Sequence, residues 1–198
     1  EDISSLVRKK YRNRISYTED NQVLFDKSCL SEKEIGKQSG LGLLISLVES
    51  SENYLYEVSD KTNVKSSTGE PKEVNVTEKD HKIINVSKTA RLNIGPRGDL
   101  PKDGYDGQVS ISPKTSFFEI DSFGDLTKKS RSSLVFHELQ ESFERTTNKK
   151  AYAYLLRNKD GSVSEDLSRK GAHQIAIDKE AKFHNKSAEP GIARIKQN

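Results

Sequence analysis

The stretch SLVFHELQESFERT, residues 133–146, contains a His-Glu pair inside an apolar run that predicts an amphipathic helix. His137 and Glu141 are four residues apart, so a helix places both side chains on one face. Glu138 then lies about 100° further round the helix. Zinc proteases with a His-Glu-x-x-His motif use this arrangement, with the glutamate as general base. Here Glu141 replaces the second histidine, so the helix would supply one imidazole and one carboxylate.

A third ligand has to come from another part of the chain, because a hydrolytic zinc site takes three protein ligands and keeps a fourth position for water. The stretch GAHQIAIDKEAKFH near the C-terminus places His173, Glu180 and His184 at spacings of 7 and 4. These spacings put all three on one stripe of a second predicted helix. The favoured metal ligands are His137, Glu141 and His173, and Glu180 or His184 are the alternatives on the second helix.

A metal held in this way predicts hydrolysis of a peptide bond, with Zn²⁺ as the cofactor. Zinc lowers the pKa of its bound water towards about 7. We therefore expect Glu138 to accept the proton of this water and to pass it to the leaving amine. Tyr152, or alternatively Tyr154, is expected to donate a hydrogen bond to the developing oxyanion. The strand SFFEID, residues 116–121, is expected to offer its edge to an extended peptide.

The same residues also fit a helix that binds no metal. A lone HExxE pattern is a weak motif, because Glu141 and Glu144 can be surface charges paired with Arg145 or with lysines. His81 and His184 are expected to be solvated or structural. In this alternative the chain is a non-catalytic module that binds a partner protein.

The helix, the tyrosine-containing segment and the later GAHQIAIDKE stretch together resemble a zincin-type metallopeptidase domain found at the C-termini of bacterial polymorphic toxins, including RHS-repeat proteins. The resemblance covers residues 105 to 185. The matching positions are His137, Glu138, Leu139, Glu141, Arg145, Thr146, Tyr152, Ala172, His173, Ala176 and Glu180. It implies a toxin or effector peptidase that acts on a protein or peptide and is neutralised by a dedicated immunity protein.

Composition limits the other classes of function. The chain has 198 residues, of which 32% are hydrophobic and 32% charged, so we expect a small core and a strongly hydrated surface. A net charge of +3 is too small to predict a nucleic-acid footprint over the whole molecule. The basic run RKKYRNR, residues 8–14, is expected to be a solvated arm. A nuclease with His137, Glu138 and His173 as acid and base groups is the third hypothesis, and nucleic acid is an unlikely partner.

Targeting signals and cysteine content bear on the setting of the protein. Cys29 is the only cysteine, so neither an intrachain disulfide nor a cysteine-based zinc cage is possible. The longest apolar run, residues 41–48, is far too short to span a bilayer, so no membrane partner is expected. The sequence begins with Glu, contains no methionine and has no signal-peptide pattern. We expect a fragment of a longer protein, and the resemblance implies a bacterial protein that is secreted or delivered.

The first part of the chain predicts a helix-and-strand subregion over residues 1–60. Residues 15–25 read as a hairpin with a polar turn. Ser31 and Glu34 have the spacing of a capping box, which predicts a helix over about 31–50. Residues 53–59 alternate like a strand.

The middle of the chain is polar and then rich in strand signals. Residues 61–80 are expected to form a loop-like connector, followed by a catalytic region over 81–198. Within that region, residues 81–87 and 90–95 read as strands. The segments GQVSISP and SFFEID are predicted to pair as antiparallel strands.

Two helices complete the predicted fold. The first covers residues 130–146, with Ser130 or Thr127 as its cap and an apolar stripe at i, i+4 and i+8 made by Val135, Leu139 and Phe143. The second covers residues 165–185. The expected class is α+β, with a small antiparallel sheet packed against helices and with the two helices sharing one site.

Overall fold

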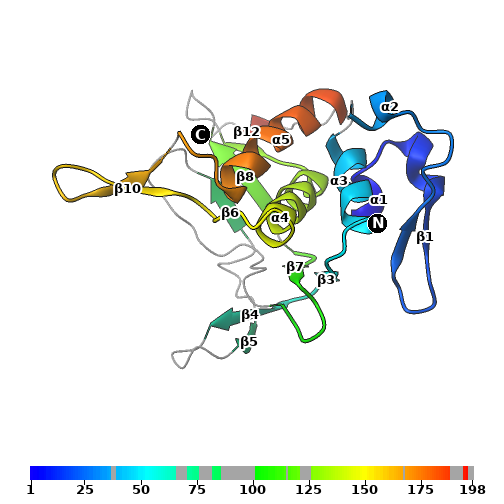
Figure 1. Ribbon diagram of the computed structural model, residues 1–198, viewed down its shortest axis with the longest axis horizontal. Coiled ribbons are helices and arrows are strands. Elements are labelled where there is room, and N and C mark those ends of the chain that lie inside the picture. The colour runs from blue at the N-terminus through cyan, green and yellow to red at the C-terminus, as the bar shows by residue number, and fades with distance from the viewer. Residues whose placement is uncertain are drawn as a thin grey trace. The chain divides into compact units, whose positions relative to one another are not determined.

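The computed structural model describes residues 1–36, 39–65, 71–75, 82–85, 101–114, 116–120, 126–166, 168–187 and 194–195. Its helices are α1 (Asp2–Ser5), the 3₁₀ helix η1 (Lys9–Arg14), α2 (Glu32–Gly36), α3 (Ser39–Val48), α4 (Arg131–Thr146) and α5 (Ala172–Ser187). Its strands are β1 (Ile15–Tyr17), β2 (Val23–Phe25), β3 (Tyr54–Val58), β4 (Lys61–Lys65), β5 (Pro71–Asn75), β6 (Lys82–Asn85), β7 (Gly107–Ile111), β8 (Ser116–Ile120), β9 (Leu126–Lys128), β10 (Leu155–Arg157), β11 (Val163–Glu165) and β12 (Arg194–Ile195). This mixture of helices and small sheets confirms the α+β class (Figure 1).

The chain groups into two compact units that do not follow chain order. Unit 1 contains Glu1–Glu52 and Phe136–Ser187, and unit 2 contains Asn53–Val135 and Ala188–Asn198. All the residues of the predicted metal group belong to unit 1. The predicted division into an N-terminal subregion (1–60), a polar connector (61–80) and a catalytic region (81–198), with the first and last parts free to fold as one domain, stays a prediction. In the described part of the chain, no helix is both long enough and apolar enough to cross a membrane.

The N-terminal hairpin of unit 1 confirms the prediction for residues 15–25. Strands β1 and β2 pair antiparallel, with Ile15 opposite Phe25. Asn21 closes the turn with a left-handed φ of 61° and donates its backbone N–H to the carbonyl of Thr18. Asparagine tolerates this conformation better than most residues, so the polar residues at the turn were enough to predict the hairpin.

The capping box at the start of α2 is also confirmed. The backbone N–H of Glu34 donates to the Ser31 hydroxyl at 3.3 Å, and the Ser31 backbone N–H donates to the Glu34 carboxylate at 3.3 Å. These hydrogen bonds from Ser31 lower the pKa of Glu34. The helix predicted over 31–50 is found as two helices, α2 and α3.

The basic run at residues 8–14 is solvated as predicted, since Arg8, Lys9, Lys10 and Arg12 are exposed, but it is a folded segment and not a loose arm. Its central Tyr11 is only 4% exposed, and residues Lys9–Arg14 form η1. Arg14 donates to the backbone carbonyls of Asp26 and Ser28 at 3.1 and 2.6 Å. The run folds because Tyr11 contributes apolar surface to the core. The prediction considered only the density of basic residues, which indicated contact with solvent.

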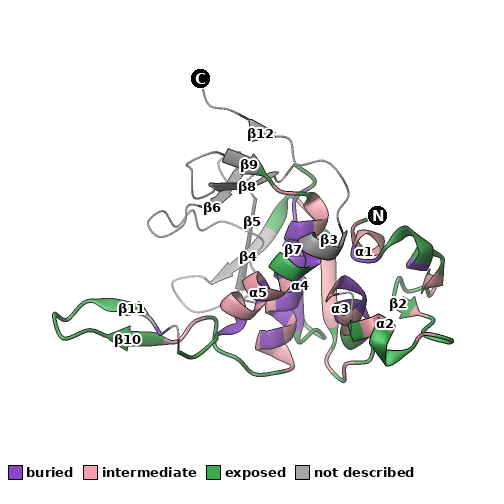
Figure 2. Ribbon diagram, turned by 90° about the horizontal axis from the view of Figure 1, so that it is seen from above, coloured by how far each residue is buried: buried purple, intermediate pink, exposed green. Residues whose placement is uncertain are grey.

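The core of unit 1 joins α3, α4 and α5. Phe136 of α4 and Phe183 of α5 stack with ring centroids 4.7 Å apart, and both are buried. A Cβ at Gly40 of α3 would lie 1.9 Å from the Leu6 carbonyl oxygen and 2.9 Å from the Phe183 ring, so only glycine allows this approach. Figure 2 colours much of α4 as buried.

Helix α4 begins where one of the two predicted caps lies. The backbone N–H of Ser133 donates to the Ser130 hydroxyl at 3.1 Å, so Ser130 is the cap, and Thr127 belongs to β9. Val135 and Leu139 of the predicted apolar stripe are buried, while Phe143 is half-buried.

The second helix starts later than predicted, at Ala172 instead of residue 165. Residues Val163–Glu165 form β11 and pair with β10, and the Asp166 carboxylate accepts the Ser168 backbone N–H in a turn. The backbone N–H groups of Ala172 and His173 then donate to the carbonyls of residues 151 and 152. The first N–H groups of a helix have no partner within the helix, and here the segment at residues 151–152 supplies their acceptors. No signal in the sequence next to residue 172 indicated this start.

The strand pairing in unit 2 corrects three predictions. Among the described strands, β7 pairs parallel with β3, and β8 lies between parallel β6 and antiparallel β9. The predicted antiparallel pair of GQVSISP and SFFEID is therefore wrong, and the sheets are not purely antiparallel. Every residue of β7 is buried, as is usual for parallel strands. Because β8 has neighbours on both sides, it does not offer the predicted free edge to a peptide.

The polar stretch that was predicted to be a connector contains a hairpin. Strands β4 and β5 pair antiparallel, with Lys61 opposite Asn75. Low hydrophobicity suggested a loop, but β-branched Thr62, Val64 and Val74 favour extended backbone. The strand predicted at 81–87 is confirmed by β6, whereas the strand predicted at 90–95 lies outside the described residues.

Candidate metal centre

Helices α4 and α5 bring the three predicted metal ligands together. The Nδ1 atom of His173 lies 3.0 Å from Oε2 of Glu141 and 3.3 Å from Nε2 of His137. The third separation, between His137 Nε2 and Glu141 Oε2, is 3.9 Å. These three residues form a group that could hold a metal ion. The two helices thus present the predicted donors to one group, and its role as a metal site stays a prediction.

The three separations fit a single small metal ion. Ligand atoms at about 2.1 Å from a tetrahedral ion lie about 3.4 Å from one another. The observed separations of 3.0, 3.3 and 3.9 Å lie on both sides of this value. Two imidazole nitrogens and one carboxylate oxygen are also a donor set found in catalytic metal sites with an open position.

Glu180, one of the two alternative ligands, contacts the other nitrogen of His137. Its Oε2 lies 2.9 Å from Nδ1, whereas Nε2 of the same ring faces Glu141 and His173. His137 thus lies between His173 and Glu180, which are about two helical turns apart on α5. The side chain of His184, the second alternative, and the whole of His81 lie outside the described residues.

The two glutamates of α4 have different environments. Glu141 directs Oε2 towards the histidines, and its Oε1 lies 3.8 Å from Nη1 of Arg145. Glu144 is only 4% exposed and accepts hydrogen bonds from Lys179, Gln140 and Asn148. The ion pairs of the alternative hypothesis are therefore present for both glutamates, Glu141 with Arg145 and Glu144 with Lys179, although Glu144 is buried and is not a surface charge.

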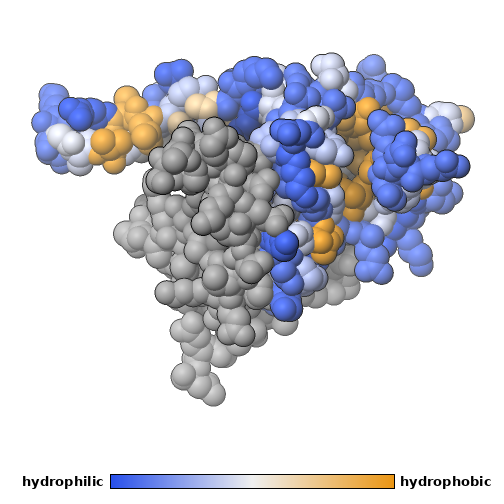
Figure 3. All heavy atoms as spheres, turned by 90° about the horizontal axis from the view of Figure 1, so that it is seen from below, coloured by the Kyte–Doolittle hydropathy of each residue, from blue (hydrophilic) through white to orange (hydrophobic). Residues whose placement is uncertain are grey.

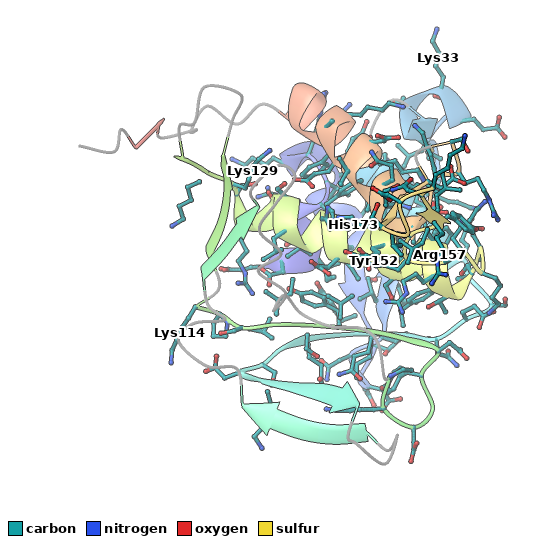
Figure 4. The ribbon with its side chains drawn as sticks, turned by 90° about the vertical axis from the view of Figure 1, so that its left-hand side faces the viewer. Lys33, Lys114, Lys129, Tyr152, Arg157 and His173 are labelled. Atoms are coloured by element: carbon teal, nitrogen blue, oxygen red, sulfur yellow. The ribbon has the colours of Figure 1, made fainter. Side chains whose placement is uncertain are left out.

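Tyr152 lies directly beside the metal group. Its ring stacks on the His173 imidazole with centroids 4.9 Å apart and an angle of 22° between the planes, and Figure 4 labels both residues. The His173 backbone N–H donates to the Tyr152 carbonyl at 3.2 Å. A Cβ on Gly171 would lie 2.4 Å from that carbonyl oxygen, so glycine is needed for this contact. Tyr154, the alternative, instead lies under the Arg169 guanidinium at 4.0 Å.

Glu138, the predicted general base, is half-buried on α4 next to His137. Its place on the helix is the one predicted from the sequence. Beyond Tyr152, the chain continues into the β10–β11 hairpin, where Leu155, Leu156 and Val163 are largely exposed. Figure 2 colours this hairpin as exposed, and Figure 3 shows hydrophobic side chains gathered on it.

Sequence reasoning did not predict the contact between Glu180 and Nδ1 of His137. One signal was available, because Glu180 is seven residues after His173 and so faces α4 on the same stripe. The spacing did not tell which atom of which partner the carboxylate would reach.

Comparisons with protein-family models, with curated proteins and with solved structures gave no match to this chain.

Proposed function

We propose that the chain is a zinc-dependent peptide hydrolase whose metal is held by His137, Glu141 and His173. One observation carries this proposal: three donor atoms of suitable types converge at separations of 3.0 to 3.9 Å. The resemblance to toxin peptidases gives the setting, a domain delivered within a larger bacterial protein and held inactive by an immunity protein.

The chain's own residues have defined tasks in this reaction. A bound zinc ion would supply a nucleophilic water near neutral pH and would polarise the scissile carbonyl. Glu138 accepts the proton of the attacking water and delivers it to the leaving nitrogen. Tyr152, which is 48% exposed, donates a hydrogen bond from its hydroxyl group to the oxyanion. Since the His173 side chain is 31% exposed, the substrate approaches from the α5 side.

The first experiment measures metal binding. Purified protein is stripped with a chelator, dialysed against limiting Zn²⁺ and analysed for bound metal. We expect one zinc ion per chain in the wild type and none in His137→Ala. A wild type that binds no zinc at neutral pH would refute the proposal.

The second experiment separates metal binding from catalysis. Zinc-loaded protein is incubated with a mixture of peptides from a digested bacterial proteome, and new termini are identified by mass spectrometry. We expect Glu138→Gln to keep its zinc and to lose about 100-fold or more in cleavage rate. The matched control is Glu144→Gln, which alters a glutamate of the same helix outside the metal group. Unchanged cleavage by Glu138→Gln would rule out its role as base.

A further inference from the structure

We propose that Glu180 is a positioning residue that fixes His137 as a metal ligand without binding the metal itself. This inference rests on the proposed metal site and concerns a residue to which that proposal gives no task. It follows from the hydrogen bond between Glu180 Oε2 and His137 Nδ1, at 2.9 Å.

The hydrogen bond determines which nitrogen of His137 is available. A carboxylate can only accept, so Nδ1 must carry the hydrogen that it donates to Glu180. In the neutral ring, Nε2 then has the lone pair, and Nε2 is the atom that lies 3.3 and 3.9 Å from the other two donors. Glu180 therefore selects the tautomer in which His137 can bind a metal.

Burial strengthens this effect. His137 and Glu180 are 8% and 7% exposed, so water competes little for either partner. A hydrogen bond to an ionised acceptor is stronger than a neutral one, and low local dielectric increases its strength. Carboxylates that hold the outer nitrogen of a ligating histidine orient the ring and raise its basicity, and their loss typically weakens metal binding about 10- to 100-fold.

The geometry also argues against Glu180 as a ligand. Its Oε2 approaches Nδ1, whereas Glu141 and His173 approach Nε2 of the same ring. The two nitrogens of an imidazole point in different directions, so the carboxylate lies outside the group of three donors. Glu180 and Glu141 thus have separate tasks, although both are glutamates that contact His137.

The experiment compares two buried glutamates. Zinc affinity is measured by competition with a chromophoric chelator for the wild type, Glu180→Gln, Glu180→Ala and the control Glu144→Gln. Glu144 is as buried as Glu180 but accepts from Lys179 instead of a histidine, so its variant reports the cost of disturbing a buried carboxylate alone. We expect Glu180→Gln to bind zinc about 10- to 100-fold more weakly, Glu180→Ala to bind still more weakly, and Glu144→Gln to match the wild type.

A second measurement reads the tautomer directly, without metal or substrate. Nitrogen NMR of the metal-free protein, with His137 assigned through His137→Ala, should show a hydrogen on Nδ1 in the wild type and in Glu144→Gln. Glu180→Ala should shift the ring towards the Nε2–H form. Circular dichroism checks that each variant is folded. If a Glu180 variant does not fold, Glu180→Asp replaces it, because aspartate keeps the charge but has a shorter side chain.

The outcomes separate this inference from the proposed function. Normal zinc affinity in both Glu180 variants would overturn the inference and leave the metal site intact. A complete loss of zinc in Glu180→Gln, equal to that in His137→Ala, would make Glu180 a ligand and would also overturn it. A wild type without zinc affinity would refute the proposed function, while the NMR measurement would still decide whether Glu180 selects the tautomer.

Discussion

The two histidines of the metal group are held in different ways. His137 lies on the buried side of α4 with its side chain 11% exposed, and a buried carboxylate on α5 fixes its ring. His173 lies in the first turn of α5 with its side chain 31% exposed, and an exposed tyrosine stacks on its ring. One candidate ligand therefore belongs to the core, and the other belongs to the surface. We call the part of the group around His137 the core side and the part around His173 the surface side. We infer that the core side fixes the positions of the donor atoms and that the surface side admits the substrate.

The largest expected effect tests whether the core side holds the two helices together. Phe183→Ala removes a buried ring that stacks on Phe136, so we expect a loss of about 3–5 kcal/mol in the free energy of unfolding. Urea denaturation followed by circular dichroism measures it. The surface control is Leu155→Ala, whose side chain is 62% exposed and should cost less than about 0.5 kcal/mol. Equal losses in the two variants would contradict the division into core and surface sides.

The next effect concerns the approach of α3 to α5 behind the core side. Gly40→Ala would place a Cβ 1.9 Å from a backbone oxygen, and we expect it to cost about 1–3 kcal/mol or more. Gly42→Ala on the same helix is the control, because its Cβ would be 3.7 Å from the nearest atom. That variant should gain up to about 1 kcal/mol from better helix propensity. Thermal unfolding of both variants checks the opposite signs, and the same sign in both would refute the packing argument.

A smaller effect compares the histidines directly in the metal-free protein. His137→Ala removes the partner of a buried carboxylate and should cost about 1–3 kcal/mol in unfolding free energy. His173→Ala affects a more exposed ring, and we expect a cost below about 1 kcal/mol. Urea titrations in the presence of a chelator provide the measurement. A larger loss of unfolding free energy in His173→Ala than in His137→Ala would contradict the assignment of His137 to the core and His173 to the surface.

The smallest effect sharpens the description of the surface side. Tyr152→Phe keeps the ring that stacks on His173, so stability and zinc affinity should stay within about 0.5 kcal/mol of the wild type. Tyr152→Ala loses the same stacking contact that His173→Ala removes and should cost about 0.5 to 1 kcal/mol. If Tyr152 stabilises the oxyanion, Tyr152→Phe should still lower the cleavage rate about 100-fold. A normal rate in that variant would leave Tyr152 with a structural task only.

The accuracy of the sequence predictions depended on how local their causes were. The hairpin at residues 15–25, the capping box at Ser31 and the cap at Ser130 were all predictable, because each depends on residues only a few positions apart. The partner of β7 was not predictable, because its pairing with β3 joins residues about 53 positions apart in the sequence. The start of α5 was missed for the same reason, since its first N–H groups bind carbonyls about 20 residues earlier in the chain.

The candidate site divides in the same way. The sequence alone determined the donor types and their faces, because the helical repeat puts His137 with Glu141 and His173 with Glu180. Only the tertiary structure decided that His137 presents Nε2 to Glu141 and His173 and Nδ1 to Glu180. The physical reason is that the packing of α4 against α5 fixes distances between side chains. Helical periodicity fixes only the direction in which each side chain leaves its own helix.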